Sequence, residues 1–145
     1  MLMAVGQGSG AQETLPMTDP RPSLPVMDRD HLSAMTSGDV DLGIEVIEIF
    51  RHQAQLWSRL LDPRLEARDW SDAAHTLKGA SLGIGALKLA AACERAEKAG
   101  RSDAPPSPAH AAVLLGDVKD ALGEALEAAA RAVYDLTASR KRSAS

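Results

Sequence analysis

The chain has 145 residues and a formal net charge of −4, with 45% hydrophobic and 25% charged residues, which fits one folded domain and not a disordered chain. The acidic balance excludes a global basic field for nucleic acid, and no apolar run approaches the roughly 18 residues that span a membrane. The single Cys93 excludes an internal disulfide and favours a reducing compartment, so we expect a cytoplasmic protein.

The first part of the chain predicts a leader followed by helices. Residues 1–26 are rich in Gly, Pro, Ser and Thr and lack any period, which predicts a disordered leader. A short helix is expected over Asp28–Met35. Apolar residues then recur every three or four positions over Asp39–Leu61, and Pro63 follows as a stop signal. Because aromatic residues make up only 3% of the chain, closely packed helices are favoured over sheets.

Three further helices are predicted in the second half. The first opens at Asp69, where Asp72 three residues later resembles a capping box, and it ends near Gly85. The next runs over Ala86–Ala99 and ends at a glycine. The last begins at Ser107–Pro108 and runs to about Leu136. The sequence thus predicts an all-α antiparallel four-helix bundle with a short extra N-terminal helix. The expected domain covers residues 27–138, followed by a basic tail at 139–145.

One face of the helix that opens at Asp69 is unusual. On a helical wheel, Asp72, His75, Gly79 and Leu82 lie opposite the core, and Lys78 flanks them. A glycine inside a helix costs roughly 1 kcal/mol relative to alanine, and this helix contains both Gly79 and Gly83. The missing side chain one turn after His75 leaves the imidazole open to another protein's surface.

The chemistry that suits this face is phosphoryl transfer through histidine. A neutral imidazole is a competent nucleophile near pH 7, because its reference pKa is about 6.5. Lys78 lies three residues after His75 and can place an ammonium near the charge of an incoming phosphoryl group. Lys78 and His75 alone are a common pair on helices, and the bare glycine beside them makes the functional interpretation much stronger.

The segment His75-Thr76-Leu77-Lys78-Gly79-Ala80-Ser81, followed by Gly85-Ala86, Leu89-Ala90, Cys93 and Glu97, resembles the signature of histidine phosphotransfer (HPt) domains of bacterial phosphorelays. The resemblance covers roughly residues 27–100. The chain departs from the family pattern at Gly83, where Asn is frequent, and at Ala96, where a larger apolar residue is frequent.

The resemblance implies that His75 is the phosphorylated residue, Lys78 its electrostatic partner and Gly79 the gap that admits a receiver domain. Such domains take phosphoryl from a receiver aspartate and pass it to another receiver. The expected partners are therefore response-regulator receiver domains and a hybrid histidine kinase. The receiver would supply Mg²⁺, and no cofactor or metal of the chain's own is expected. Without a P-loop or a nucleotide-binding loop, the chain is expected to be a phosphocarrier and not an ATP-dependent kinase.

The helix over Asp39–Leu61 carries extra apolar residues beside its core stripe. Leu42, Ile49, Leu56 and Leu60 could pack on the short first helix or on the leader, or they could extend a receiver-docking patch that includes Leu82. In the second interpretation, the docking surface consists of Leu42, Ile49, Asp72, Gly79, Leu82 and Gly83.

Two other functions share these features. An all-helical adaptor could dock receivers or kinases without transferring phosphoryl, although it would not need an accepting histidine with a lysine three residues on. A dimeric kinase docking domain also exposes a histidine, but it pairs two hairpins, whereas this chain supplies four helices and is expected to be a monomer. Cys93 lies on an apolar stripe and is expected to be buried and inert.

Overall fold

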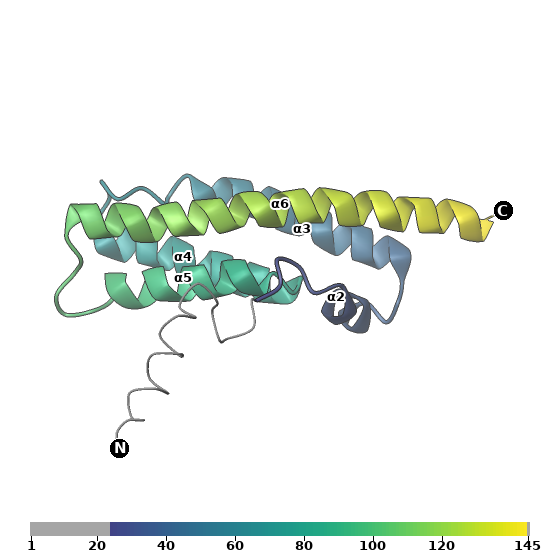
Figure 1. Cartoon of the computed structure of the whole chain (residues 1–145), viewed down its shortest axis with the longest axis horizontal. Coiled ribbons are helices and arrows are strands. Elements are labelled where there is room, and N and C mark those ends of the chain that lie inside the picture. Colours follow the sequence, from purple (N-terminus) through teal and green to yellow (C-terminus); the bar gives the residue numbers. More distant parts are fainter. Residues whose placement is uncertain (1–23, 145) are drawn as a thin grey trace, which may run out of the picture.

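The computed structural model describes residues 24–144. This part of the chain forms helices α2 (Arg29–Met35), α3 (Val40–Ser58), α4 (Ala67–Gly83), α5 (Leu87–Gly100) and α6 (Pro108–Ala144). The four long helices form a closed ring of packing pairs, in which α3 contacts α4, α4 contacts α5, α5 contacts α6, and α6 contacts α3. Figure 1 shows them side by side along one axis, with the short α2 near the start of α3. The prediction of an all-α four-helix bundle with a short extra helix is confirmed.

The core is built from aliphatic side chains and many alanines around two large aromatic rings. Trp70 of α4 and Phe50 of α3 are each only 2% exposed. Small residues between them let the helices approach closely, as the composition predicts. The fully buried alanines are Ala54, Ala73, Ala74, Ala86, Ala96, Ala125, Ala129 and Ala132.

Helices α4 and α5 approach each other closely at Gly100. A Cβ added there would lie 2.7 Å from Cβ of Ser71 and 2.8 Å from Cζ3 of Trp70. No real side chain tolerates such distances, so the glycine is required for α4 and α5 to pack at this spacing. The spacing matters for function, because it sets which polar side chains of the two helices can touch.

Helix α4 begins earlier than predicted. Its first residue is Ala67 and its N-cap is Glu66, whose side chain makes no capping hydrogen bond, so the predicted cap at Asp69 is wrong. Ala67 packs against the core, and this burial extends the helix by a turn at its start. Asp69 instead lies in the first turn, where a negative charge is still favourable to the helix dipole.

A short strap precedes α2 and crosses the junction between α4 and α5. The backbone N–H of Asp28 donates to the carbonyl of Gly85 (2.9 Å), and that of Lys88 donates to the carbonyl of Pro25 (3.0 Å). Gly85 has φ +76°, and a Cβ there would meet the carbonyl oxygen of Asp28 at 2.8 Å. Glycine is therefore needed at this junction for both conformation and space. The predicted leader lies largely outside the described residues, since only residues 24–26 of it are described.

The last helix is longer than predicted. It continues past Leu136 to Ala144, so the described part of the predicted basic tail is helical. Figure 1 shows this end of α6 running beyond the other helices. Ion pairs hold α6 to its neighbours, with Arg29 of α2 on Asp135 (3.1 Å) and Arg140 on Asp41 of α3 (2.8 Å). The predicted domain boundaries at residues 27 and 138 stay a prediction.

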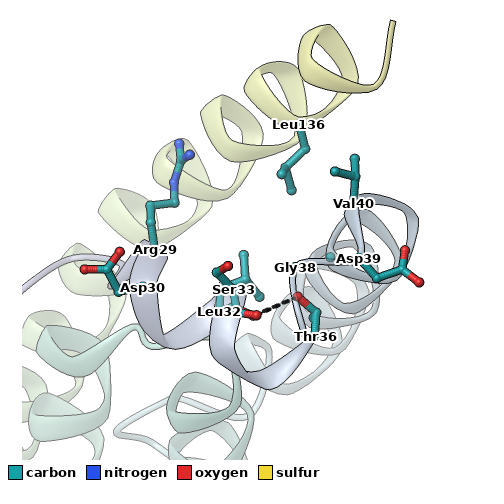
Figure 2. Close-up of a pocket in the computed structure, with 10 residues that line it drawn as sticks. Arg29, Asp30, Leu32, Ser33, Thr36, Gly38, Asp39, Val40 and Leu136 are labelled. Carbon is teal, nitrogen blue, oxygen red and sulfur yellow. Dashed lines mark hydrogen bonds between the residues drawn. The ribbon is translucent and has the colours of Figure 1, made fainter. Parts of the chain in front are cut away.

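A small hollow lies where α2, the start of α3 and α6 meet (Figure 2). Its volume is about 270 Å³, and Leu136 of α6 points toward it. At the C-cap of α2, the hydroxyl of Thr36 donates to the carbonyl of Leu32 at 2.9 Å. None of the sequence-predicted site residues lines this hollow. Its lining residues are Arg29, Asp30, Leu32, Ser33, Thr36, Gly38, Asp39, Val40, Gly43 and Leu136.

The close packing at Gly100 gives a test of the fold. Gly100→Ala is expected to lower the free energy of unfolding by about 1–3 kcal/mol, because the added methyl group must displace Trp70 or Ser71. Gly116→Ala in α6 is the control, since a Cβ there meets nothing within 4 Å, and it should raise stability by up to about 1 kcal/mol. Urea unfolding followed by circular dichroism measures both. Equal effects at the two positions would show that α4 and α5 do not approach so closely.

Candidate functional site

His75 stands in the middle of α4 with its side chain 58% exposed. Its sequence neighbours on the core face, Ala74 and Leu77, are fully buried and fix this orientation of the helix. Asp72, Gly79 and Leu82 are also exposed, as the wheel predicts, and Lys78 is half-buried beside them. The structure therefore brings the predicted chemical residues to one surface.

Helix α5 places a carboxylate under this surface. Glu97 is only 7% exposed, and its Oε2 lies 2.8 Å from Nδ1 of His75. Its other oxygen, Oε1, lies 2.8 Å from Nζ of Lys78. One nearly buried carboxylate thus contacts both the imidazole and the ammonium.

Arg101, the C-cap residue of α5, closes the network from the outside. Its Nη1 donates to Oε2 of Glu97 at 2.7 Å, and its Nη2 donates to Oδ1 of Asp72 at 2.8 Å. Asp72 and Arg101 are about half-exposed, whereas the Glu97 side chain between them and Lys78 is 10% exposed. The charges alternate in sign from Asp72 through Arg101 and Glu97 to Lys78.

These contacts keep Glu97 and Lys78 charged. Burial alone would raise the pKa of Glu97, but the contacts with Lys78 and His75 outweigh it and hold that pKa below its ordinary value. The contact with Glu97 raises the pKa of Lys78, against the opposing effect of desolvation. At neutral pH the pair is therefore a carboxylate and an ammonium.

The contact with Glu97 also decides the tautomer of His75. An ionised carboxylate can only accept hydrogen bonds, so Nδ1 of the neutral ring must carry the hydrogen that it donates to Oε2. The other ring nitrogen, Nε2, then has a free lone pair. The arrangement fixes the imidazole by one nitrogen and leaves the other as a nucleophile.

The two glycines of α4 near His75 have no packing role in the described part of the chain. A Cβ built at Gly79 or at Gly83 meets nothing within 4 Å. The helix would gain stability from an alanine at either position, and no neighbouring helix would have to move. The fold therefore does not require glycine at either of these positions beside His75.

The extra apolar residues of α3 are exposed, as is Leu82 of α4. Leu42 is 41% exposed, Ile49 51% and Leu82 47%, and Leu56 and Leu60 are exposed as well. The short helix α2 therefore does not bury them. Packing on residues 1–23 concerns a segment outside the described residues.

Sequence reasoning missed Glu97 and Arg101 as site residues. Glu97 had a signal, because it continues in steps of four the buried stripe of Leu89 and Cys93, where a carboxylate needs a partner. Arg101 had none, because it lies beyond the predicted end of its helix and acts on a residue of another helix. Cys93 is buried with a pKa raised to about 12 by desolvation, which confirms an inert thiol.

One family model and one solved structure are similar to this chain. The family model described as the Hpt domain matches residues 45–132. The crystal structure of the histidine phosphotransferase ShpA from Caulobacter crescentus is 35% identical to this chain, with a TM-score of 0.64. That match covers 81% of this chain and 98% of the other. None of the curated proteins matches this chain.

No helix in residues 24–144 is long and apolar enough to cross a membrane.

The family model covers more than half of the chain, and the solved structure agrees with it in fold and in sequence. The chain therefore belongs to the Hpt domain family and has a phosphotransfer role in a phosphorelay.

Proposed function

We propose that His75 accepts a phosphoryl group on Nε2 from the aspartyl phosphate of a receiver domain and passes it to a second receiver. The observation that carries this proposal is the 2.8 Å contact between Nδ1 of His75 and the nearly buried Glu97 carboxylate. It supports Nε2 as the nucleophile, because the hydrogen of the neutral ring lies on the other nitrogen.

The transfer is a displacement at phosphorus. The lone pair of Nε2 forms the N–P bond while the bond between phosphorus and the aspartyl oxygen breaks, and its electron pair returns to the aspartate as a carboxylate. Nδ1 keeps its hydrogen, so the ring gains a positive charge. The ionised Glu97 stabilises that charge at 2.8 Å. Because no proton has to leave the ring, the same step runs in reverse toward the second receiver.

Lys78 provides the cation for the phosphoryl oxygens. Its side chain is 23% exposed, so its ammonium can turn from Glu97 toward the surface on which His75 stands. In this proposal the receiver supplies Mg²⁺, and the chain acts as a monomeric cytoplasmic phosphocarrier without a kinase activity of its own. Its partners are response-regulator receivers and a hybrid histidine kinase.

The docking surface in this proposal surrounds His75. Gly79 gives the receiver access to the imidazole. It lies one turn after His75 on an open surface, and the absence of a side chain leaves the space beside the ring free. Exposed apolar side chains on α3 and α4 supply contact area around it. The proposed surface consists of Leu42, Ile49, Asp72, Gly79, Leu82 and Gly83.

The assignment of His75 is tested by phosphoryl labelling. A phosphorylated receiver should label the wild-type chain and should not label His75→Gln, which keeps a polar side chain at an exposed position. The bond should be labile to acid, as a phosphoramidate is. His110→Gln is the matched control, since His110 lies on α6 outside the site, and it should be labelled like the wild type.

Equal labelling of His75→Gln would refute the acceptor role. A wild-type chain that binds the receiver but gains no label would instead support the adaptor function, in which the surface is used for docking alone.

The role of Gly79 is tested by setting access against stability. Gly79→Lys should hold or raise the melting temperature, because the position is open and lysine is the better helix former. The long side chain should displace the receiver, and a misplacement of about 1 Å can cost on the order of a hundredfold in rate. Gly123→Lys in α6 is the control, because Gly123 is equally open.

Rapid-quench phosphoryl labelling measures the transfer rate, and thermal unfolding measures the melting temperature. The control should leave the transfer rate unchanged. A Gly79→Lys variant with a wild-type rate would place the docking surface elsewhere.

A further inference from the structure

The two oxygens of the Glu97 carboxylate contact three side chains. Oε1 pairs with Lys78, whereas Oε2 receives hydrogen bonds from both His75 and Arg101. Because the side chain is nearly buried, an unpaired charge on it would be strongly destabilising. At least one cation must therefore remain on this carboxylate at all times.

Lys78 cannot be that cation in the transfer step. With its Nζ at 2.8 Å from Glu97, its charge is already engaged, and it must turn outward to reach a phosphoryl group on Nε2. The lysine stem is flexible enough for such a movement. When it moves, Oε1 loses its ion pair before the imidazole has gained its positive charge, and the carboxylate is then free to rotate away from His75.

Arg101 has the geometry to prevent this. Its guanidinium uses separate nitrogens for Glu97 and Asp72, at 2.7 and 2.8 Å, so it is held at both ends of the fork. Asp72 lies on α4, one turn before His75, and Arg101 caps α5. The fork thus ties the carboxylate to the helix that carries the imidazole.

We propose that Arg101, anchored by Asp72, is a positioning residue that keeps Glu97 neutralised and in contact with His75 while Lys78 turns toward the phosphoryl group. The proposal rests on the phosphotransfer function of His75. Arg101 acts through Glu97 and touches neither the reacting nitrogen nor the phosphoryl group. Its contribution is to let one lysine leave a buried carboxylate without disordering the imidazole.

The structure supplies a matched control for this test. Lys98 also pairs with a glutamate four residues earlier on α5, at 3.0 Å from Glu94, but both side chains are well exposed and neither contacts His75. Lys98→Gln therefore removes the same kind of helix ion pair from the same helix. It should change neither the transfer rate nor the imidazole.

The first measurement is the rate of transfer from a phosphorylated receiver. Arg101→Gln should lower the maximal rate about tenfold or more, a coupling of ordinary size for one network, and leave the receiver concentration at half-maximal rate unchanged. Lys78→Ala should also be slow. The double variant Lys78→Ala/Arg101→Gln should be slower than Lys78→Ala alone, because in Lys78→Ala the guanidinium of Arg101 still holds Glu97 against His75, and the double variant loses that contact as well.

The second measurement needs no transfer. In ¹⁵N NMR of the free protein, Lys78→Ala should keep the tautomer with hydrogen on Nδ1, because Arg101 still holds Glu97. The double variant should lose this preference, because the carboxylate then has no cation. Circular dichroism checks that each variant is folded, and the double variant should be the least stable of them, because its nearly buried carboxylate has lost both Lys78 and Arg101.

Wild-type rates in Arg101→Gln, or a double variant as fast as Lys78→Ala, would overturn the proposal. So would a tautomer in the double variant identical to that of Lys78→Ala. Failure of the wild-type chain to accept any label is a different result, because it refutes the proposed function, and the tautomer measurement then decides separately whether Arg101 holds Glu97 in place.

Discussion

The site depends on one contact, the hydrogen bond between His75 on α4 and the nearly buried Glu97 on α5. It requires that two helices approach closely, which the glycine at position 100 permits, and that a carboxylate stay ionised beneath the surface. The contacts with Lys78 and His75 keep the carboxylate ionised, and Arg101 contacts the same oxygen as His75. Glu97 therefore links the packing of the core to the chemistry of the surface. The helix spacing that buries Trp70 also brings the Glu97 carboxylate to the imidazole.

The glycines of the bundle form two groups, those that helix packing requires and those that it does not. At Gly85 and Gly100 a side chain would collide with neighbouring atoms, so these positions serve the fold. At Gly79 and Gly83 a side chain would meet nothing within 4 Å. Glycine therefore lowers the stability of the helix at these two positions without improving its packing. In the proposed function, the approach of a partner to His75 accounts for the second pair, and local stability is given up where access is needed, as is common at functional sites.

Periodicity and composition predicted the bundle and the exposed face of α4, because both follow from which side chains must be buried. They did not predict the start of α4 at Ala67 or the end of α6 at Ala144, since packing and ion pairs to other helices extend those ends. His75 could be found from its own helix. The buried stripe of α5 indicates only that the carboxylate of Glu97 needs a partner; which residue that partner is, and the role of Arg101, could not be predicted, because these contacts join α4 to α5.

The most direct test of this account is NMR of the phosphorylated chain labelled with ¹⁵N in its histidines. Coupling between phosphorus and a ring nitrogen identifies the atom that carries the phosphoryl group. The account predicts coupling to Nε2 of His75, with Nδ1 still protonated and hydrogen-bonded to Glu97. Phosphorylation on Nδ1, or on another residue, would contradict it, because the Glu97 carboxylate would then not determine which nitrogen is the nucleophile.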